Sequence, residues 1–465
     1  MRLFRKFRLK NNKSCFYSII FLATLSAGIL IILSYNNGEE KLQHRRPGLF
    51  AADYENQDDR HPDHNLFMLN QQHDMLNGWK IPDFHGSNFF KHDSDKLWLQ
   101  DMFAGKKNFS KQCTTEVQNI TFLKIHKTGS STIQNILMRF GSRNNLKFVL
   151  PPRGHHLGYP NYFQKAYMVE SSDGLYNIFC HHARFNNEVI TNLMPGNTIY
   201  MTILRDPASV FESAFTYFLM GKKCNYNLPD RQALEMFLNN PMACYSQLKH
   251  ATHARNPLFY DFGLETKNFE DSNTVDLSIE IIDRKFPLVM IAEYFEESVI
   301  LLKDLLCWTW EDMTYFKLNS RNEESINQIT DDMRKKIYDW NKADKRLYDY
   351  FNWTFWRKID EYGHERMHDD VLRLRELNEK WKSVCLQSDQ VTKKGQGNFK
   401  IFQPPGVKIN NFLLKPEAER NSVCQNMVMP EPQFTEKLRI KQFPNLAHKI
   451  RPNKQHIYPQ NKPKF

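Results

Sequence analysis

Three consecutive runs decide the fold: Ile120-Thr-Phe-Leu-Lys-Ile125, His126-Lys-Thr-Gly-Ser-Ser131 and Thr132-Ile-Gln-Asn-Ile-Leu-Met-Arg-Phe140. The first run is apolar and predicts a buried strand, the second predicts a turn, and the third predicts a helix. In the helix, apolar residues recur at positions i, i+3, i+4 and i+7, which gives one apolar stripe. A helix that begins at a Ser or Thr cap just after a strand presents free N–H groups and a positive dipole end, so this loop is a candidate anion site.

The loop also carries its own charge and hydroxyl groups. Lys127 adds a cation, and Ser130, Ser131 and Thr132 add hydroxyl donors. The loop is not a Walker A motif, because Lys127 precedes its only glycine, so hydrolysis of a nucleoside triphosphate is not favoured. An ordinary capped turn between a strand and a helix is the alternative for this pattern taken alone.

A second strand, loop and helix follow later in the chain. Residues 197–204 predict a buried strand, and Asp206-Pro207 is a start signal for a helix over residues 208–218. Arg205 stands at the carboxyl end of the strand, where ligands bind in open α/β sheets, and Ser213 can face the same crevice from the helix. A salt bridge to a neighbouring acid is the alternative role for Arg205. Two such units predict an α/β fold with a parallel sheet and suit a ligand with two separated phosphate groups.

The amino terminus predicts a membrane anchor. Residues 1–13 carry six basic side chains and no acid, and residues 15–35 are 21 residues without a charge, enough to cross a bilayer as one helix. A cleaved signal peptide is the alternative, but the apolar run is longer than a typical signal segment. The charge asymmetry predicts a cytosolic amino terminus and a lumenal bulk. The predicted parts are a cytoplasmic tail (1–13), a transmembrane signal anchor (14–35), a lumenal stem (36–111), a catalytic domain (112–385) and a loosely ordered basic C-terminal tail (386–465).

Composition excludes several classes of protein. Of the 465 residues, 41% are hydrophobic, so the chain is not disordered throughout. The net charge is +11, but residues 14–385 carry −4, so the basic charge is no argument for nucleic-acid binding. The seven lumenal cysteines lack C-x-x-C spacing, which disfavours zinc and allows up to three disulfides with one thiol left over. The 17 histidines also lack metal-ligand spacing, so we expect no required metal, and sequons at Asn108, Asn119 and Asn352 predict a glycoprotein.

Seven segments, taken in order, resemble the sulfotransferases that use 3′-phosphoadenosine 5′-phosphosulfate, and in particular the Golgi galactose 3-O-sulfotransferases. The first segment is specific to sulfotransferases, and the later ones narrow the resemblance to this family. The resemblance covers roughly residues 112–385, together with the short tail and anchor. The segments are Phe122-Leu-Lys-Ile-His-Lys-Thr-Gly-Ser-Ser-Thr132, Cys180-His-His-Ala-Arg-Phe185, Leu204-Arg-Asp-Pro-Ala208 with Phe211-Glu-Ser213, Glu293-Tyr-Phe-Glu-Glu-Ser298, Leu301-Leu-Lys-Asp-Leu-Leu-Cys-Trp308, Tyr315-Phe-Lys-Leu-Asn319 and Phe355-Trp-Arg-Lys358.

The resemblance implies a P-loop-like, three-layer sulfotransferase fold with a central parallel sheet, preceded by one transmembrane helix. It implies that the first loop binds the 5′-phosphosulfate of the donor, and that Arg205 and Ser213 bind its 3′-phosphate. Lys317 and Arg321 would close over the nucleotide. The loop positions that match the family are Lys124, Lys127, Thr128, Gly129, Ser130, Ser131 and Thr132.

The resemblance further implies an enzyme that moves a sulfuryl group to the 3-hydroxyl of a terminal β-galactose, on a galactosylceramide-like glycolipid or on a glycan. The acceptor hydroxyl needs a base near neutral pH, and we expect His182 in this role. Without the resemblance, His182 and its neighbour would be interpreted as a solvated pair at a strand end. The other catalytic candidates are Lys127, Lys124 and His126, and the runners-up for the base are His181, His126 and Glu293.

The implied location is the Golgi membrane, as a single-pass type II protein whose catalytic domain is lumenal. The implied partners are the galactoside acceptor and the membrane, without nucleic acid, and the sequence leaves the oligomeric state open, a homodimer included. One alternative is a sulfotransferase for another glycan such as a glycosaminoglycan, which the −4 charge of residues 14–385 disfavours. Another is a non-catalytic, membrane-tethered glycan-binding relative, which the intact Lys127, Arg205 and Ser213 disfavour.

Overall fold

The computed structural model describes residues 113, 115–248, 252–391, 398–399, 401–405 and 407–447. The predicted cytoplasmic tail, membrane anchor and stem lie outside these residues. Within them, no helix combines the length and the apolar character that crossing a bilayer requires.

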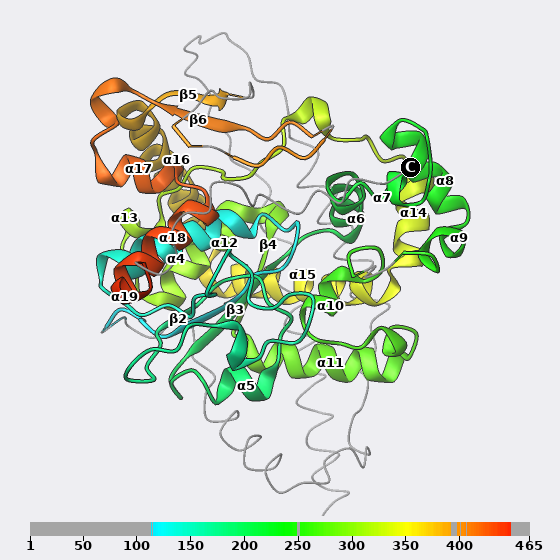
Figure 1. Ribbon diagram of the computed structural model, residues 1–465, viewed down its shortest axis with the longest axis horizontal. Helices are drawn as coiled ribbons and strands as arrows, with labels where there is room; N and C mark the ends of the chain where they lie inside the picture. The colour runs from blue at the N-terminus through cyan, green and yellow to red at the C-terminus, as the bar shows by residue number, and fades with distance from the viewer. Residues whose placement is uncertain are drawn as a thin grey trace, which may run out of the picture. The chain divides into compact units, whose positions relative to one another are not determined.

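A four-stranded parallel sheet lies at the centre of the described fold (Figure 1). The strand order is β2-β1-β3-β4, and β1 pairs Ile120 with Ile178 on one side and with Ile199 on the other. All residues of β1 and β4 are buried, as expected for a parallel sheet that is covered on both faces. These findings confirm the predicted α/β fold with a central parallel sheet. The strands are β1 (Ile120–Leu123), β2 (Ile178–Phe179), β3 (Ile199–Leu204) and β4 (Leu288–Ile291).

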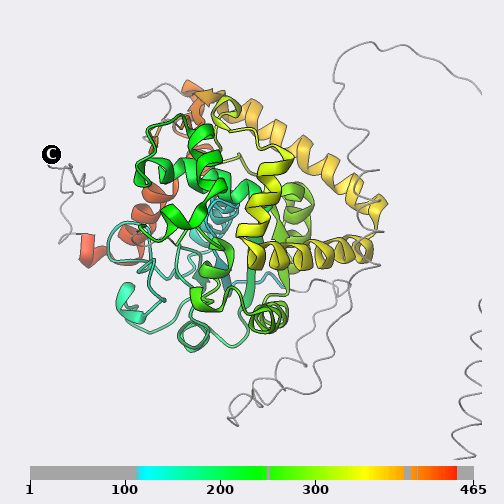
Figure 2. The same cartoon turned by 90° about the vertical axis from the view of Figure 1, so that its right-hand side faces the viewer.

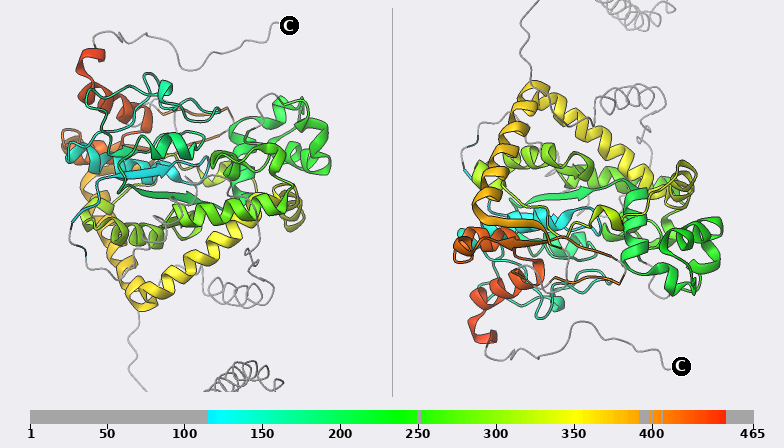
Figure 3. Two further views of the ribbon diagram at one scale, coloured as in Figure 1. Left: turned by 90° about the horizontal axis from the view of Figure 1, so that it is seen from below. Right: turned by 90° about the horizontal axis from the view of Figure 1, so that it is seen from above.

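Helices cover both faces of the sheet, with α15 and α16 on one side and α18 on the other (Figure 3). One hydrophobic core joins these layers, from Phe122 in β1 to Phe355 in α15 and Phe434 in α18. The helices are α4 (Ser130–Arg143), α5 (Asn187–Thr191), α6 (Pro207–Tyr217), α7 (Met220–Lys223), α8 (Asp230–Asn239), α9 (Pro241–Tyr245), α10 (Pro257–Asp261), α11 (Ser272–Lys285), α12 (Phe295–Leu306), α13 (Trp310–Met313), α14 (Asp331–Trp340), α15 (Lys342–Tyr362), α16 (His364–Cys385), α17 (Ser422–Val428), α18 (Glu431–Gln442) and α19 (Pro444–Ala447).

The two predicted strand–loop–helix units are present, but their helices begin differently. At α6 the side chain of Asp206 accepts a hydrogen bond from the Ser209 backbone N–H at 2.9 Å, which confirms the predicted start. The helix α4 has no side-chain cap, because its N-cap is Gly129, with φ of 77° in the left-handed region that favours glycine. The Ser130 hydroxyl instead donates back to the Ile125 carbonyl at 2.8 Å. The hydroxyl therefore fixes the loop and leaves the first N–H groups of α4 without an intrahelical partner.

The chain beyond Cys385 differs from the prediction. We expected a loosely ordered tail from residue 386, but the described part of it continues as β5 (Leu386–Val391), β6 (Asn411–Leu414) and three helices. The strands β5 and β6 pair antiparallel, and the Cys385–Cys424 disulfide holds this segment to the end of α16. Apolar side chains from β5 to α17 form a separate cluster with Phe316, whereas those of α18 belong to the main core. The prediction rested on the Gly-, Pro- and Lys-rich composition, which does not indicate such long-range contacts.

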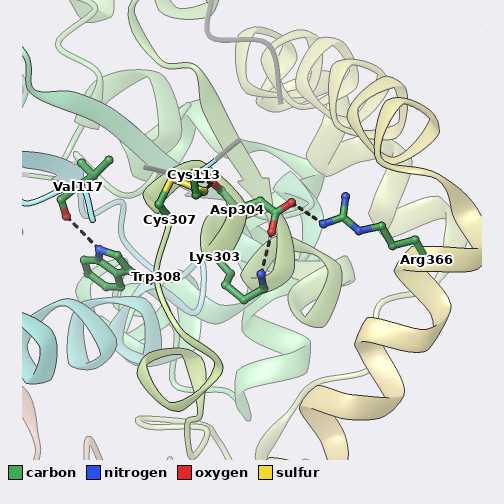
Figure 4. Close-up of a disulfide and its surroundings, with 7 residues drawn as sticks. All are labelled: Cys113, Val117, Lys303, Asp304, Cys307, Trp308 and Arg366. Atoms are coloured by element: carbon green, nitrogen blue, oxygen red, sulfur yellow. Dashed lines mark hydrogen bonds and ion pairs between the residues drawn. A yellow bond between two sulfur atoms is a disulfide. The ribbon is translucent and has the colours of Figure 1, made fainter. Parts of the chain in front are cut away.

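The seven cysteines among the described residues form three disulfides, as expected, and leave Cys180 as a buried thiol. Cys113–Cys307 fastens the start of the described domain to the end of α12, and Figure 4 shows its surroundings. Beside it, the Trp308 indole N–H donates to the Val117 carbonyl at 2.9 Å. The remaining pairs are Cys224–Cys244 and Cys385–Cys424.

The helices α15 and α16 are long and meet at a sharp corner (Figure 2). Only Gly363 separates them, and its φ of 95° is accessible to glycine but strained for other residues. On α16 the residues Met367, Val371 and Leu374 are buried and share one apolar face, whose spacing is visible in the sequence. This corner brings the end of α16 to the start of the C-terminal segment, and so to one wall of the site.

Candidate active site

A cavity of about 1810 Å³ opens where the loops that follow β1, β2 and β3 meet the C-terminal segment. Almost all of the candidate donor-binding and catalytic residues line it. Thr128 does not, because it is fully buried and its hydroxyl donates to the Ile125 carbonyl at 3.1 Å. The candidates that line the cavity are Lys124, His126, Lys127, Gly129, Ser130, Ser131, Thr132, His182, Arg205, Ser213, Lys317 and Arg321.

Lys127 lies at the turn of the first loop in an unusual backbone conformation. Its φ of 63° is in the left-handed region, which is uncommon for a residue other than glycine. Its ammonium group lies 3.6 Å above the centre of the Tyr217 ring. Burial, and to a smaller extent the charges of Arg321 and Arg205, lower the pKa of Lys127 to about 7. The loop therefore gathers three cationic side chains, of which Arg321 alone has an acidic ion-pair partner among the described residues.

Arg205 and Arg321 contribute to this charge from two different segments. Arg205 donates to the Lys127 carbonyl at 3.4 Å, and no ion pair with an acid holds it among the described residues. Among the described residues, Arg205 forms no salt bridge with the neighbouring Asp206, whose carboxylate instead accepts hydrogen bonds from Arg334 and Tyr338. Arg321 forms an ion pair with the buried Glu212 of α6. These contacts hold both guanidinium groups beside the loop.

The segment around Lys317 approaches the loop through the backbone. The Leu318 N–H donates to the Thr132 hydroxyl at 3.1 Å, which places the segment against the first turn of α4. Ser213 is buried on α6 and borders the same cavity. We call this part of the cavity the cationic end; it consists of Lys127, Arg205, Ser213, Lys317 and Arg321.

His182 lies next to the backbone of Lys124. Its Nδ1 is 2.8 Å from the Lys124 carbonyl oxygen, and because a carbonyl only accepts, Nδ1 must carry the proton. In the neutral ring, Nε2 then holds the lone pair. Burial and the charge of Lys124 keep the pKa of His182 well below its usual value, so the ring is neutral near pH 7. A neutral imidazole with a free lone pair is able to accept a proton.

His126 stacks on His182, with 3.9 Å between the ring centres. Asp261, at the end of α10, accepts hydrogen bonds from the His126 ring at 2.8 Å and from the His126 backbone N–H at 2.9 Å. Burial raises the pKa of Asp261 and lowers that of His126. No local sequence pattern identifies Asp261, which lies 135 positions along the chain from its partner His126. This carboxylate fixes the ring against which His182 packs.

The structure places two of the other base candidates away from the cavity. His181 is fully buried, and its Nε2 is 2.9 Å from the Thr435 hydroxyl. Glu293 accepts hydrogen bonds from the Asp206 N–H at 2.9 Å and from the Tyr348 hydroxyl at 3.1 Å. Neither residue borders the cavity, whereas His126 and His182 both do.

Glu431 is a site residue that we did not predict. It forms an ion pair with Lys124, whose side chain is 1% exposed, and it accepts a hydrogen bond from Gln134 at 2.9 Å. Burial alone would raise the pKa of Glu431, but the charges of Lys124, His155 and His181 and the hydrogen bond from Lys124 together outweigh burial and lower it to about 2. A Pro-Glu-Pro start signal with Phe434 and Leu438 one turn apart could have revealed the helix that carries it.

Comparisons with known proteins agree with this geometry. A sequence model described as galactose-3-O-sulfotransferase matches residues 89–442. Human galactosylceramide sulfotransferase is 37% identical over 325 residues, which are 68% of this chain and 77% of that protein. Human galactose-3-O-sulfotransferase 2 is 35% identical over 339 residues (70% and 84%), and mouse galactose-3-O-sulfotransferase 3 is 35% identical over 336 residues (70% and 78%).

The chain belongs to the galactose-3-O-sulfotransferase family. The family match extends well beyond the predicted domain of residues 112–385 and includes α17 and α18. In this galactose-3-O-sulfotransferase family member, the C-terminal segment is therefore part of the family region, and it supplies Glu431 to the cavity. In the part of the chain that the structure describes, no group of three or more His, Cys, Asp or Glu side chains is arranged to hold a metal ion.

Proposed function

We propose that this protein transfers a sulfuryl group from 3′-phosphoadenosine 5′-phosphosulfate to the 3-hydroxyl of a terminal β-galactose, on a galactosylceramide-like glycolipid or on a glycan. Membership of the family and the names of the relatives support this assignment. One observation carries it. A loop that gathers cationic side chains and a neutral histidine border the same cavity.

The cationic end fits a donor with two separated anionic groups. Lys127 and the first N–H groups of α4 would hold the 5′-phosphosulfate, and Arg205 and Ser213 would hold the 3′-phosphate. Lys317 and Arg321 would contact the nucleotide from above the loop. Bound there, the donor supplies an activated sulfuryl group, whose sulfur bonds to the acceptor oxygen as its bond to the 5′-phosphate oxygen breaks.

The side chains provide position and charge for this displacement. His182 Nε2 accepts the proton of the acceptor hydroxyl, and the bond from Nδ1 to the Lys124 carbonyl keeps the ring in the required tautomer. Lys127 stabilises the negative charge that develops on the 5′-phosphate. Lys124, held by Glu431, adds a second positive charge near the reacting groups. In-line transfer of this kind relies on orientation and electrostatics, as phosphoryl transfer does.

We place the protein in the Golgi membrane as a single-pass type II protein with a lumenal catalytic domain. The uncharged run over residues 15–35, with six basic residues before it, supports this proposal. Three disulfides also suit the oxidising environment of the secretory pathway. Protease protection of the full chain in sealed microsomes tests the orientation, and cleavage of residues 113–447 without detergent would contradict it.

The activity is tested with labelled donor and the full chain in detergent. The acceptors are galactosylceramide, lactosylceramide, N-acetyllactosamine and heparan. We expect transfer to galactosides, and in His182→Ala a loss of about 100-fold or more in rate with donor binding retained. Transfer to heparan alone would contradict the acceptor assignment, and a folded protein that does not bind the donor would contradict the sulfotransferase assignment. Full activity in His182→Ala would contradict the role of the base.

A further inference from the structure

The cavity has a second end whose chemistry differs from that of the cationic end. We call it the histidine end; it consists of His155, His156, His182 and Glu431. Here the protein presents imidazole rings and a carboxylate instead of uncompensated cations. Lys124 also lines the cavity, and its charge is balanced by Glu431. An anionic donor is attracted to the cationic end, so the histidine end remains for the other substrate.

One face of α18 builds this end of the cavity. Its polar residues are spaced by four, four and three positions, which places them on one face of the helix. Each of them bonds a different part of the sheet or its loops. Glu431 pairs with Lys124, Thr435 bonds His181 at 2.9 Å, Arg439 donates to the Pro151 and Gly154 carbonyls, and Gln442 bonds the Phe148 N–H and carbonyl at 2.9 Å each.

The loop that Arg439 holds runs directly beside the expected base. The Leu157 N–H donates to the His182 carbonyl at 2.8 Å, and His156 pairs with His182 as a parallel β-bridge. The centres of the His156 and His182 rings are 5.5 Å apart. A ligand at the histidine end is therefore within reach of His182.

We propose that the histidine end binds the acceptor sugar and that Glu431 accepts hydrogen bonds from its hydroxyl groups. This inference rests on the proposed function. A neutral galactoside offers several hydroxyl donors, and a carboxylate is the strongest side-chain acceptor for them. Each oxygen of Glu431 has one partner on the protein side, Lys124 or Gln134, and a carboxylate oxygen is able to accept two hydrogen bonds.

The surroundings of Glu431 also make it a rigid acceptor. Its side chain is 12% exposed and borders the cavity, while the ion pair and Gln134 fix both of its oxygens. A fixed carboxylate loses little conformational entropy when a sugar binds, so its hydrogen bonds contribute fully to affinity. The helix α18 is thus an acceptor-binding element, in addition to closing the sheet.

The test compares two matched substitutions on α18 in the full chain. Glu431→Gln removes the carboxylate charge and replaces one of its two acceptor oxygens with an amide donor, whereas Glu436→Gln makes the same change at a residue that does not border the cavity. With N-acetyllactosamine, or galactosylceramide if only the lipid is a substrate, we expect Glu431→Gln to raise the acceptor KM by about tenfold or more. The donor KM should stay within about twofold, and Glu436→Gln should leave both constants unchanged.

His155→Ala provides a second variant if Glu431→Gln does not fold, because it leaves the ion pair between Lys124 and Glu431 in place. It should raise the acceptor KM by about threefold or more, again with little change in donor KM. An unchanged acceptor KM in the folded variants, or a rise confined to the donor KM, would overturn this inference while leaving the proposed function intact. No transfer by the wild-type protein to any galactoside would instead overturn the proposed function.

Discussion

Two regions form the walls of the same cavity, and they owe their structure to different kinds of contact. The β1–α4 and β3–α6 units follow from local patterns, with apolar strands, short loops and apolar stripes on the helices that follow. The segment over residues 386–447 has no such regular pattern, and it is placed by partners far along the chain. Lys124 and Glu431 are 307 positions apart, and Arg439 reaches Pro151 over 288 positions. One wall of the cavity is therefore built by local sequence patterns, and the other by contacts between distant parts of the chain.

The two regions also contribute different chemical groups to the cavity. The loops of the first region carry Lys127, Arg205 and Ser213, which concentrate positive charge. The C-terminal segment contributes a carboxylate and closes the other end of the cavity. Charge for the donor comes from residues whose backbone is fixed locally, whereas the opposite wall depends on how well the C-terminal segment is held. The following predictions test that dependence.

The largest expected effect is the loss of the Cys385–Cys424 disulfide. Cys385→Ser with Cys424→Ser opens a loop of 39 positions and should lower the free energy of unfolding by about 2–4 kcal/mol. Because this bond anchors the segment that carries Glu431, the acceptor KM should rise together with the loss of stability. Urea unfolding and initial rates on the full chain in detergent measure both effects.

The control is the second double variant, Cys224→Ser with Cys244→Ser. That disulfide closes 20 positions in a separate apolar cluster, and neither cysteine borders the cavity. It should lower the free energy of unfolding by about 2–3 kcal/mol but leave the acceptor KM unchanged. If the two double variants change the acceptor KM equally, the C-terminal segment has no special part in the site.

The second prediction concerns Lys127 of the first region. Unlike Lys124, it forms no ion pair with the C-terminal segment among the described residues. Lys127 faces Arg321, Arg205, Glu212 and Lys124, and burial lowers its pKa to about 7. Above that pH the free protein holds Lys127 mostly neutral, so binding of an anion must take up a proton. The affinity for 3′-phosphoadenosine 5′-phosphate should therefore fall by up to about tenfold per pH unit above pH 7.

Calorimetric titrations from about pH 6.5 to about pH 8.5, in buffers of different ionisation enthalpy, measure both the affinity and the proton uptake. Lys127→Arg is the control, since a guanidinium stays charged throughout this range and should flatten the profile. His182 does not confuse the result, because its pKa lies well below its usual value. A flat profile in the wild-type protein would show that Lys127 does not hold the anion.

Most of the fold and about one side of the site could be predicted from the sequence. The strand at residues 120–125, the Asp206 start of α6 and the apolar face of α16 depend on neighbours within a few positions, so their patterns are visible. The cation-lined loop is visible for the same reason. Glu431 and Asp261 act through residues more than 100 positions away, and no local pattern identifies such partners. The Gly- and Pro-rich composition after Cys385 even favoured the wrong interpretation.

The smallest expected effect tests whether local signals matter in the C-terminal segment at all. The side chain of Asn421 caps α17 by accepting hydrogen bonds from the Val423 N–H at 2.9 Å and the Cys424 N–H at 3.4 Å. Asn421→Ala should lower the free energy of unfolding by about 1 kcal/mol, the usual cost of a lost cap, and should leave the acceptor KM unchanged. Urea titration resolves such a change, with Asn421→Asp as a control that retains the cap. A loss above about 3 kcal/mol would mean that the cap, and not the distant partners, holds the segment in place.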